Sequence, residues 1–198
     1  MPVICVANSK STGKTTISLN LIHHLSPDFI IDLDIHKGLS DINRLGGGLS
    51  IHSTQNKEEL LRWLDCEDKL VFVDTGGFDS TLNRIALSQS DVIITPTSDD
   101  PHDQLRLVKF NETMSAVSEM VNEDLIAHVI LNRVHHSRRT FDDFDELVGG
   151  LKHLTRLQRV IPQSAKLPRA AFKGQAVKSG SLAAIFNGLS KDILMMLK

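Results

Sequence analysis

Residues 8–16 read Asn8-Ser9-Lys10-Ser11-Thr12-Gly13-Lys14-Thr15-Thr16, and this stretch decides the fold because it joins two segments of different periodicity. The run before it, Val3–Ala7, is continuously apolar and of strand length. The segment after it places apolar side chains on one helical face, at Ile17, Leu21, Ile22 and Leu25. A strand, a loop ending in Gly-Lys-Thr and a helix together predict a phosphate-binding loop.

The residue types of this loop have specific expected roles. Successive backbone N–H groups over Ser11, Thr12 and Gly13, with the following helix N-terminus, form a nest for phosphate oxygens. Lys14 is expected to neutralise the β- and γ-phosphates, and the Thr15 hydroxyl to bind Mg²⁺. The first glycine of the pattern G-x-x-x-x-G-K-[ST] is replaced by Asn8.

Apolar runs recur along the chain with helical segments between them. The runs expected to be strands are Val3–Ala7, Phe29–Leu33, Leu70–Val73, Val92–Thr95, Ala127–Leu131 and Leu157–Ile161. This alternation predicts an α/β fold, a doubly wound and mostly parallel sheet flanked by helices, as one domain over residues 1–198. The stretch Gly38–Lys57, with three consecutive glycines, is expected to be a mobile loop.

Acidic residues follow two of the predicted strands. Asp32 and Asp34 come at the end of the second run, where alternation places both carboxylates on one side. Asp74 ends the third run and precedes Gly76 and Gly77. Because ligands bind outside the carboxyl ends of strands in such sheets, we expect these acids to lie near Lys14. A capping role at the strand end is the alternative for Asp32 and Asp34.

Composition and charge limit the class of protein. No apolar run approaches the length of a membrane span, and two cysteines do not form a disulfide framework, so a cytoplasmic protein is expected. The net charge is −2, but the segment 150–198 contains nine Lys or Arg residues and one acid. That segment is either a polyanion-binding face or a solvated basic flank. Helix-turn spacing would cluster Arg156, Arg159, Lys166, Arg169 and Lys173.

Several stretches together resemble the ParA-type partition ATPases of the ParA/MinD family of deviant Walker P-loop proteins. They are the lysine-bearing loop, "DLDIHKGLSD", "VFVDTGG", "SDVIITPTSDDPHDQ" and "VILNRV". The second stretch resembles the family's D-x-D-P-Q segment, with Ile35 in place of the proline. The resemblance covers most of the chain, and the lack of an N-terminal extension is similar to the small plasmid-type members.

The resemblance implies that ATP with Mg²⁺ is the cofactor and that two subunits close around it. It implies that Lys14 and Thr16 contact phosphates, that Asp34 positions the attacking water, and that Thr15 and Asp74 support Mg²⁺. Asn132 resembles a residue that contacts adenine. The family's signature lysine, which reaches the partner's phosphates, falls on Ser9 in an ungapped alignment and on Lys10 if the loop is one residue shorter. We favour Lys10 as a catalytic residue.

The function expected from this resemblance is that of a slow ATPase that drives plasmid or chromosome partition. It would dimerise on ATP, bind DNA non-specifically through the basic segment, and be stimulated by a centromere-binding ParB-like protein. It would be associated with the nucleoid and not with a membrane. Two alternatives stay open, a non-hydrolysing nucleotide-dependent switch that positions another cargo and a small-molecule P-loop synthetase.

Overall fold

A computed structural model of the protein describes residues 2–9, 12–66 and 68–197. Seven strands form one sheet, and they are Val3–Val6 (β1), Phe29–Asp32 (β2), Ile51–His52 (β3), Val71–Asp74 (β4), Val92–Thr97 (β5), Ala127–Val134 (β6) and Leu154–Pro162 (β7). All the strand pairs are parallel. The predicted fold class, a doubly wound α/β sheet, is therefore confirmed.

Helices connect the strands and cover both faces of the sheet. They are Lys14–Leu25 (α1), Gly38–Arg44 (α2), Lys57–Leu64 (α3), Thr81–Ser88 (α4), Pro101–Val121 (α5), Asp142–Gly149 (α6), Lys166–Ala171 (α7) and Gly180–Met196 (α8). Among the described residues, no helix combines the length and apolar composition needed to cross a bilayer.

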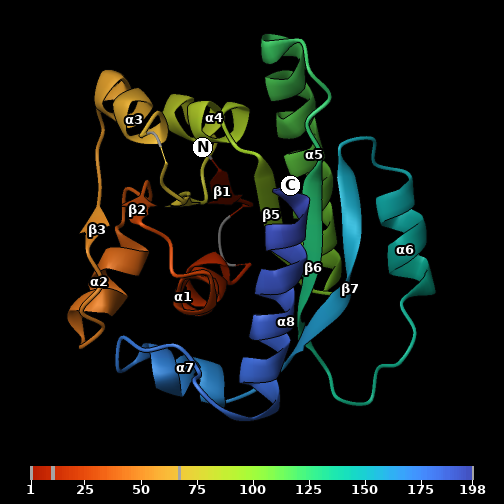
Figure 1. The fold of residues 1–198 in the computed structure, drawn as a ribbon. Coiled ribbons are helices and arrows are strands. Elements are labelled where there is room, and N and C mark those ends of the chain that lie inside the picture. The colour runs from red at the N-terminus through yellow and green to blue at the C-terminus, as the bar shows by residue number, and fades with distance from the viewer. Residues whose placement is uncertain (1, 10–11, 67, 198) are drawn as a thin grey trace.

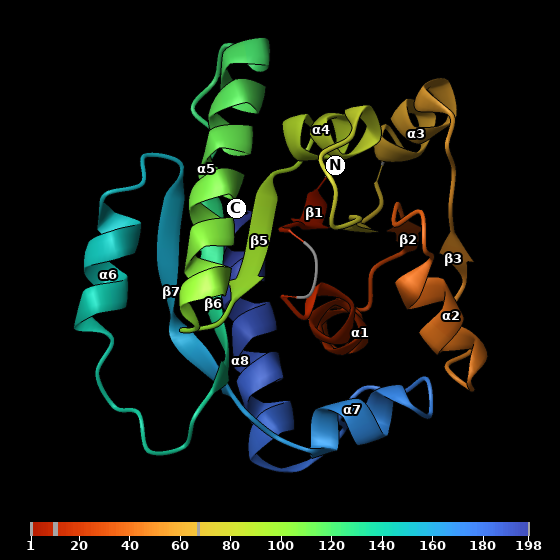
Figure 2. The same ribbon diagram turned by 180° about the vertical axis from the view of Figure 1, so that it is seen from behind.

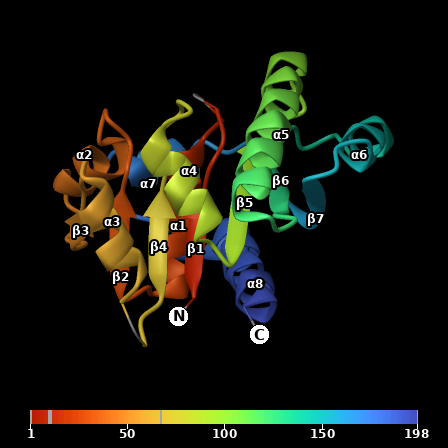
Figure 3. The same ribbon diagram turned by 90° about the horizontal axis from the view of Figure 1, so that it is seen from above.

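The strand order is β3-β2-β4-β1-β5-β6-β7, which Figure 3 shows from left to right. The chain leaves β1 toward β2 on one side, returns to β4, and then crosses β1 to reach β5. The carboxyl ends of β1 and β5 therefore flank the point at which the direction of winding reverses. Ligands bind in the crevice at this point in open α/β sheets.

Two apolar layers hold the helices to the sheet. Buried residues of α3, α4, α5 and α6 form one layer, and buried residues of α1, α2, α7 and α8 form the other. In Figure 1 α8 lies in front of the sheet, and in the reversed view of Figure 2 α5 takes that place. Each strand alternates its side chains between the layers, as Ile4 and Cys5 of β1 do.

The segment Gly38–Lys57 differs from the predicted mobile loop. Its first part is α2, and the strand β3 pairs in parallel with β2. The backbone N–H and hydroxyl of Ser40 both donate to Oδ2 of Asp32, at 2.9 and 2.8 Å. A contact with the end of β2, rather than local periodicity, therefore orders this helix.

Candidate nucleotide-binding site

The Lys14 side chain reaches back to Ser9, at the start of the segment that joins β1 to α1. Lys14 Nζ donates a 2.9 Å hydrogen bond to the carbonyl oxygen of Ser9, and Thr12 Oγ1 donates to the same oxygen at 3.2 Å. At the base of the loop, Asn8 Nδ2 donates to the carbonyl of Pro96 in β5 at 2.7 Å. The start of the loop is thus fixed to the strand on the other side of the crevice.

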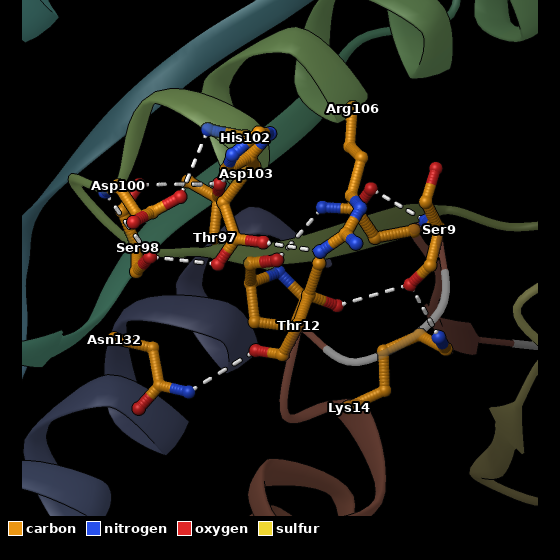
Figure 4. Close-up of polar contacts among 12 residues, drawn as sticks. Ser9, Thr12, Lys14, Thr97, Ser98, Asp100, His102, Asp103, Arg106 and Asn132 are labelled. Carbon is orange, nitrogen blue, oxygen red and sulfur yellow. Dashed lines mark hydrogen bonds and ion pairs between the residues drawn. The ribbon is translucent and has the colours of Figure 1, made fainter.

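Gly13 takes a backbone conformation that favours glycine, with φ of 93°. A Cβ at this position would lie 2.5 Å from Nδ2 of Asn132. That same nitrogen donates a 3.2 Å hydrogen bond to the carbonyl of Thr12, as Figure 4 shows. Asn132 is 4% exposed and therefore braces the loop from β6, a contact that could not be predicted from the sequence.

Thr15 and Asp34 both lie close to Gly38. A Cβ on Gly38 would be 3.3 Å from Thr15 Oγ1 and 3.8 Å from Asp34 Oδ2. Gly76, beyond the end of β4, approaches Asp34 in the same way, because a Cβ added to Gly76 would lie 3.4 Å from the Asp34 Cα. The phosphate loop, the β2–α2 turn and the β4–α4 loop therefore meet at one place.

Asp74 is a deeply buried acid of the site. It is 1% exposed, and its Oδ1 accepts a 2.8 Å hydrogen bond from the Ser18 hydroxyl. Its Oδ2 is buried and has no hydrogen-bond partner among the described residues. Burial raises the pKa of Asp74 to about 7, opposed by the Ser18 hydrogen bond. A buried carboxylate oxygen without a donor suits a cation.

The charges of Lys14 and the acids lie close enough to influence each other. Burial lowers the pKa of Lys14, while the charges of Asp74 and Asp34 act in the opposite direction. Burial also raises the pKa of Asp32, which accepts hydrogen bonds from Ser40 and from the Asp34 backbone N–H. The predicted convergence of Lys14 with acids from two strand ends is therefore present in the structure.

Magnesium suits the oxygen atoms that this arrangement offers. In the described part of the chain, no three His, Cys, Asp or Glu side chains are grouped to hold a metal ion. Mg²⁺ typically uses one or two protein ligands and completes its shell with water and phosphate oxygens. The unpaired oxygen of Asp74 and the Thr15 hydroxyl, both at this edge of the sheet, meet that requirement.

The loop between β5 and α5 forms a second polar cluster beside the crevice (Figure 4). Asp100 caps α5 by accepting from the His102 backbone N–H at 2.8 Å, and Pro101 takes the first helical position. Asp103, 6% exposed, accepts from Ser98 Oγ at 2.6 Å and pairs with Arg106 at 2.8 Å. No local sequence pattern indicated the contact of Asp103 with Ser98, because it joins a helix to the loop before it.

Lys10 and Ser11, predicted to act in catalysis and in phosphate binding, lie outside the described residues. Thr16 lies in the first turn of α1 and is half-buried. The choice between Ser9 and Lys10 for the signature position stays a prediction, as do the contacts of Thr16 and Asn132 with a nucleotide.

The predicted basic cluster is corrected in part. Arg156 and Arg159 lie on strand β7 rather than on a helix, so their spacing directs them to opposite faces of the sheet. Arg156 pairs with Asp145 of α6, and Arg159 pairs with Asp192 of α8 at 2.5 Å. Lys166, Arg169 and Lys173 instead lie exposed on α7 and just beyond it.

Comparisons with known proteins agree with this geometry. Residues 4–177 match the model of the CobQ/CobB/MinD/ParA nucleotide-binding domain. No protein of curated function matches the chain in sequence.

Solved structures of other proteins share the fold, and three of them illustrate the similarity. A protein described as a plasmid partition protein from Borrelia burgdorferi, bound to AMPPNP, is 15% identical with a TM-score of 0.70, over 98% of this chain and 97% of that one. McdA from Cyanothece is 15% identical with a TM-score of 0.75, over 98% and 99%. MinD from Pyrococcus horikoshii, complexed with Mg-ADP, is 16% identical with a TM-score of 0.68, over 97% and 95%.

The matched family model spans most of the chain and includes the phosphate loop, both acidic strand ends and Asn132. The chain shares its fold with proteins whose structures hold AMPPNP or Mg-ADP. The protein therefore belongs to the CobQ/CobB/MinD/ParA nucleotide-binding family and has the fold of the ParA/MinD ATPases.

Proposed function

We propose that the protein is a ParA-like ATPase, with residues 1–198 acting as one catalytic domain. It binds MgATP, closes as a dimer around the nucleotide, holds DNA without sequence preference, and hydrolyses ATP slowly to move a cargo. The observation that supports this most strongly is the buried Oδ2 of Asp74, which lacks a partner among the described residues at the edge where Lys14 and Thr15 lie.

Lys14, Thr15 and Asp74 hold the nucleotide in this proposal. When the nucleotide binds, Lys14 replaces its hydrogen bond to the Ser9 carbonyl with contacts to phosphate oxygens. Backbone N–H groups at the start of α1 add a second set of donors for the phosphates. When bound, magnesium supplies positive charge that offsets charge on the phosphate oxygens, with Thr15 and Asp74 as its protein-side supports.

Hydrolysis depends on Asp34 and Lys10. Asp34 is half-buried next to Gly76 and Thr15, a position from which its carboxylate orients a water toward the terminal phosphate. Lys10 supplies positive charge to the phosphate of the partner subunit. A loop with Lys10 and Ser11 in place of glycines is also the feature that favours the second candidate, a switch that binds ATP without hydrolysing it.

Dimerisation is supported by apolar side chains exposed beside the site. Ile35 is 65% exposed and Phe78 is 52% exposed, and they follow the neighbouring strands β2 and β4 at the edge of the sheet where Lys14 lies. The rings of His36 and Phe78 lie 6.4 Å apart, so the two loops present neighbouring surfaces. Burying them against a second copy removes apolar area from water.

DNA binding is assigned to Lys166, Arg169 and Lys173. These side chains are exposed and form no ion pair with any described residue, whereas Arg156 and Arg159 are already paired with carboxylates. Lysines and arginines that meet phosphates release counterions, so binding would be tolerant of sequence and sensitive to salt. A cytoplasmic, nucleoid-associated protein stimulated by a ParB-like partner is the corresponding cellular role.

The experiment that tests the proposal measures mass in solution and phosphate release on the same samples. The ATPase predicts a dimer with MgATP and not with ADP, and phosphate release that rises with DNA and the partner protein. A dimer without phosphate release under any of these conditions would favour the switch. A monomer in MgATP that still consumes ATP would contradict the sandwich dimer.

A further inference from the structure

A cavity of about 180 Å³ lies next to the nucleotide loop, and the proposed function assigns no ligand to it. The start of that loop, Ala7–Ser9, forms one side of it, and the β4–α4 loop, residues 76–79, forms another. Helices α4 and α5 complete the lining with Leu87 and Phe110. We propose that this cavity binds a small organic acid that carries an apolar ring and a hydrogen-bond donor, and that the acid regulates nucleotide binding.

The side chain of Asn83 is the reason for expecting a hydrogen-bond donor on the ligand. The side chain lines the cavity and is 7% exposed. Its Nδ2 donates to the carbonyls of Gly76, at 3.3 Å, and of Phe78, at 2.6 Å. Two carbonyl acceptors fix the orientation of the amide, which leaves Oδ1 buried with no partner among the described residues. Such an acceptor is satisfied by an O–H or N–H group brought by a ligand.

The walls support an apolar body. Ala7, Leu87 and Phe110 line the cavity and are buried, at 2%, 1% and 6% exposure. Apolar walls with a few polar groups at defined positions are typical of small-molecule sites. A volume of about 180 Å³ accommodates a single substituted ring.

The charges at the rim favour an acid. Lys109 lines the cavity from α5, is exposed, and forms no ion pair within the described part of the chain. Asp79, also at the rim, is paired through both carboxylate oxygens with Arg84, at 2.8 and 2.5 Å. The negative charge of Asp79 is therefore offset by Arg84, whereas the positive charge of Lys109 is not offset. An unpaired cation at the rim suits a ligand that carries a carboxylate.

The position of the cavity gives the ligand its effect. Ser9, whose carbonyl holds Lys14, and Gly76, which contacts Asp34, both line the cavity. A ligand that orders these two segments changes the free energy of nucleotide binding, and the nucleotide changes ligand affinity by the same factor. This regulation rests on the proposed nucleotide site, but the binding of the acid does not.

The test uses 4-hydroxyphenylacetate as the probe, titrated into the nucleotide-free full chain and followed by NMR and calorimetry. Phenylacetate lacks the hydroxyl that Asn83 Oδ1 would accept from, and 4-methylphenol lacks the carboxylate that Lys109 would pair with. Each analogue is expected to bind about five- to tenfold more weakly than the probe, the size of a single hydrogen bond or ion pair.

Two variants connect binding to the cavity. Thr113→Leu extends a side chain into it from α5, and Lys109→Gln removes the free cation. Both substitutions are expected to weaken binding of the probe. The control is Lys152→Gln, because Lys152 is exposed, pairs with Asp124 and lies outside the cavity. This control is expected to leave the affinity for the probe unchanged. Thermal unfolding of each variant verifies that it is folded. If Thr113→Leu does not fold, Lys109→Gln still tests the cavity.

The outcomes separate this inference from the proposed function. Three results would overturn the assignment of the cavity: no binding of the probe, binding of both analogues as tight as that of the probe, or undiminished binding of the probe by Lys109→Gln. MgATP affinity is measured separately on the same protein, so those results would leave the proposed ATPase untouched. Conversely, probe binding without MgATP binding would support the cavity and contradict the ATPase.

Discussion

The Ser18 hydroxyl, on the second turn of α1, donates a 2.8 Å hydrogen bond to Oδ1 of Asp74 at the end of β4, 56 positions later in the chain. This contact joins the helix that begins at the phosphate loop to the acid assigned to magnesium. It also offsets part of the burial that raises the pKa of Asp74. The hydrogen bond therefore fixes the position of helix α1 relative to Asp74.

Ser18→Ala removes this donor and is expected to weaken nucleotide binding in the presence of Mg²⁺ by about tenfold or more, because a hydrogen bond to a charged group contributes about 1.5–3 kcal/mol. Binding of nucleotide without Mg²⁺ should change little. Calorimetry with and without Mg²⁺ measures both. Equal losses under the two conditions would show that the variant damages the loop and not the metal side.

The buried Asp74 also predicts how stability depends on pH. Its pKa is raised from 3.8 to about 7 by burial, so the folded state holds this proton more tightly than the unfolded state does. The stabilising contribution is complete below about pH 4 and is lost as pH rises toward 7. At about pH 8, Asp74→Asn should be more stable than the natural protein by up to about 4 kcal/mol.

Urea unfolding across this range, without nucleotide or Mg²⁺, measures the difference between the two proteins. The expected difference is small at the acid end and grows with pH. Comparison with Asp74→Asn isolates this one group from the other titrating side chains. A difference that stays constant from about pH 4 to about pH 8 would mean that Asp74 does not titrate there.

Gly13→Ala tests the shape of the loop. The added Cβ meets Asn132 Nδ2 at 2.5 Å, and the left-handed conformation alone costs about 1–2 kcal/mol. We expect loss of nucleotide binding and a lower free energy of unfolding. Gly149→Ala is the matched control, because a Cβ there has no neighbour within 4 Å and the backbone φ is ordinary. If both variants bind nucleotide equally, the close packing of the loop has no role in binding.

The exposed cations of α7 predict a salt-dependent contact with DNA. Lys166→Glu with Arg169→Glu should weaken DNA binding by about tenfold or more at low salt and reduce the dependence of affinity on salt. MgATP affinity should not change. The control is Lys152→Glu with Lys191→Glu, which makes the same charge change at exposed positions away from α7. An equal effect of the two pairs would indicate that net charge, and not α7, governs the contact.

Much of the sheet could be predicted from the sequence, because buried parallel strands are continuous apolar runs. All six predicted strands are present, with ends that move by up to three residues. β3 was missed because two residues, Ile51–His52, are too short to form a pattern. α2 was missed because it has one buried apolar residue, Leu39, and depends on the contact between Ser40 and Asp32.

The positions of candidate site residues could be predicted where they follow from strand ends. They could not be predicted where they depend on tertiary contacts. Lys14, Asp34 and Asp74 each follow or end a strand, and parallel strands bring such positions to one edge. The bracing of Thr12 by Asn132 joins residues 120 positions apart and has no local signal. The expected clustering of Arg156 and Arg159 was wrong, because a three-residue spacing brings side chains to one face only in a helix and both residues lie on β7.

The central claim is that Lys14 and Asp74 converge on one magnesium-bound triphosphate, and calorimetric titration of the protein with MgATP tests it most directly. The account predicts binding that depends on Mg²⁺ and is lost in both Lys14→Ala and Asp74→Asn, while the two variants stay folded by circular dichroism. Binding that persists unchanged in both folded variants, or no binding by the natural protein, would contradict it.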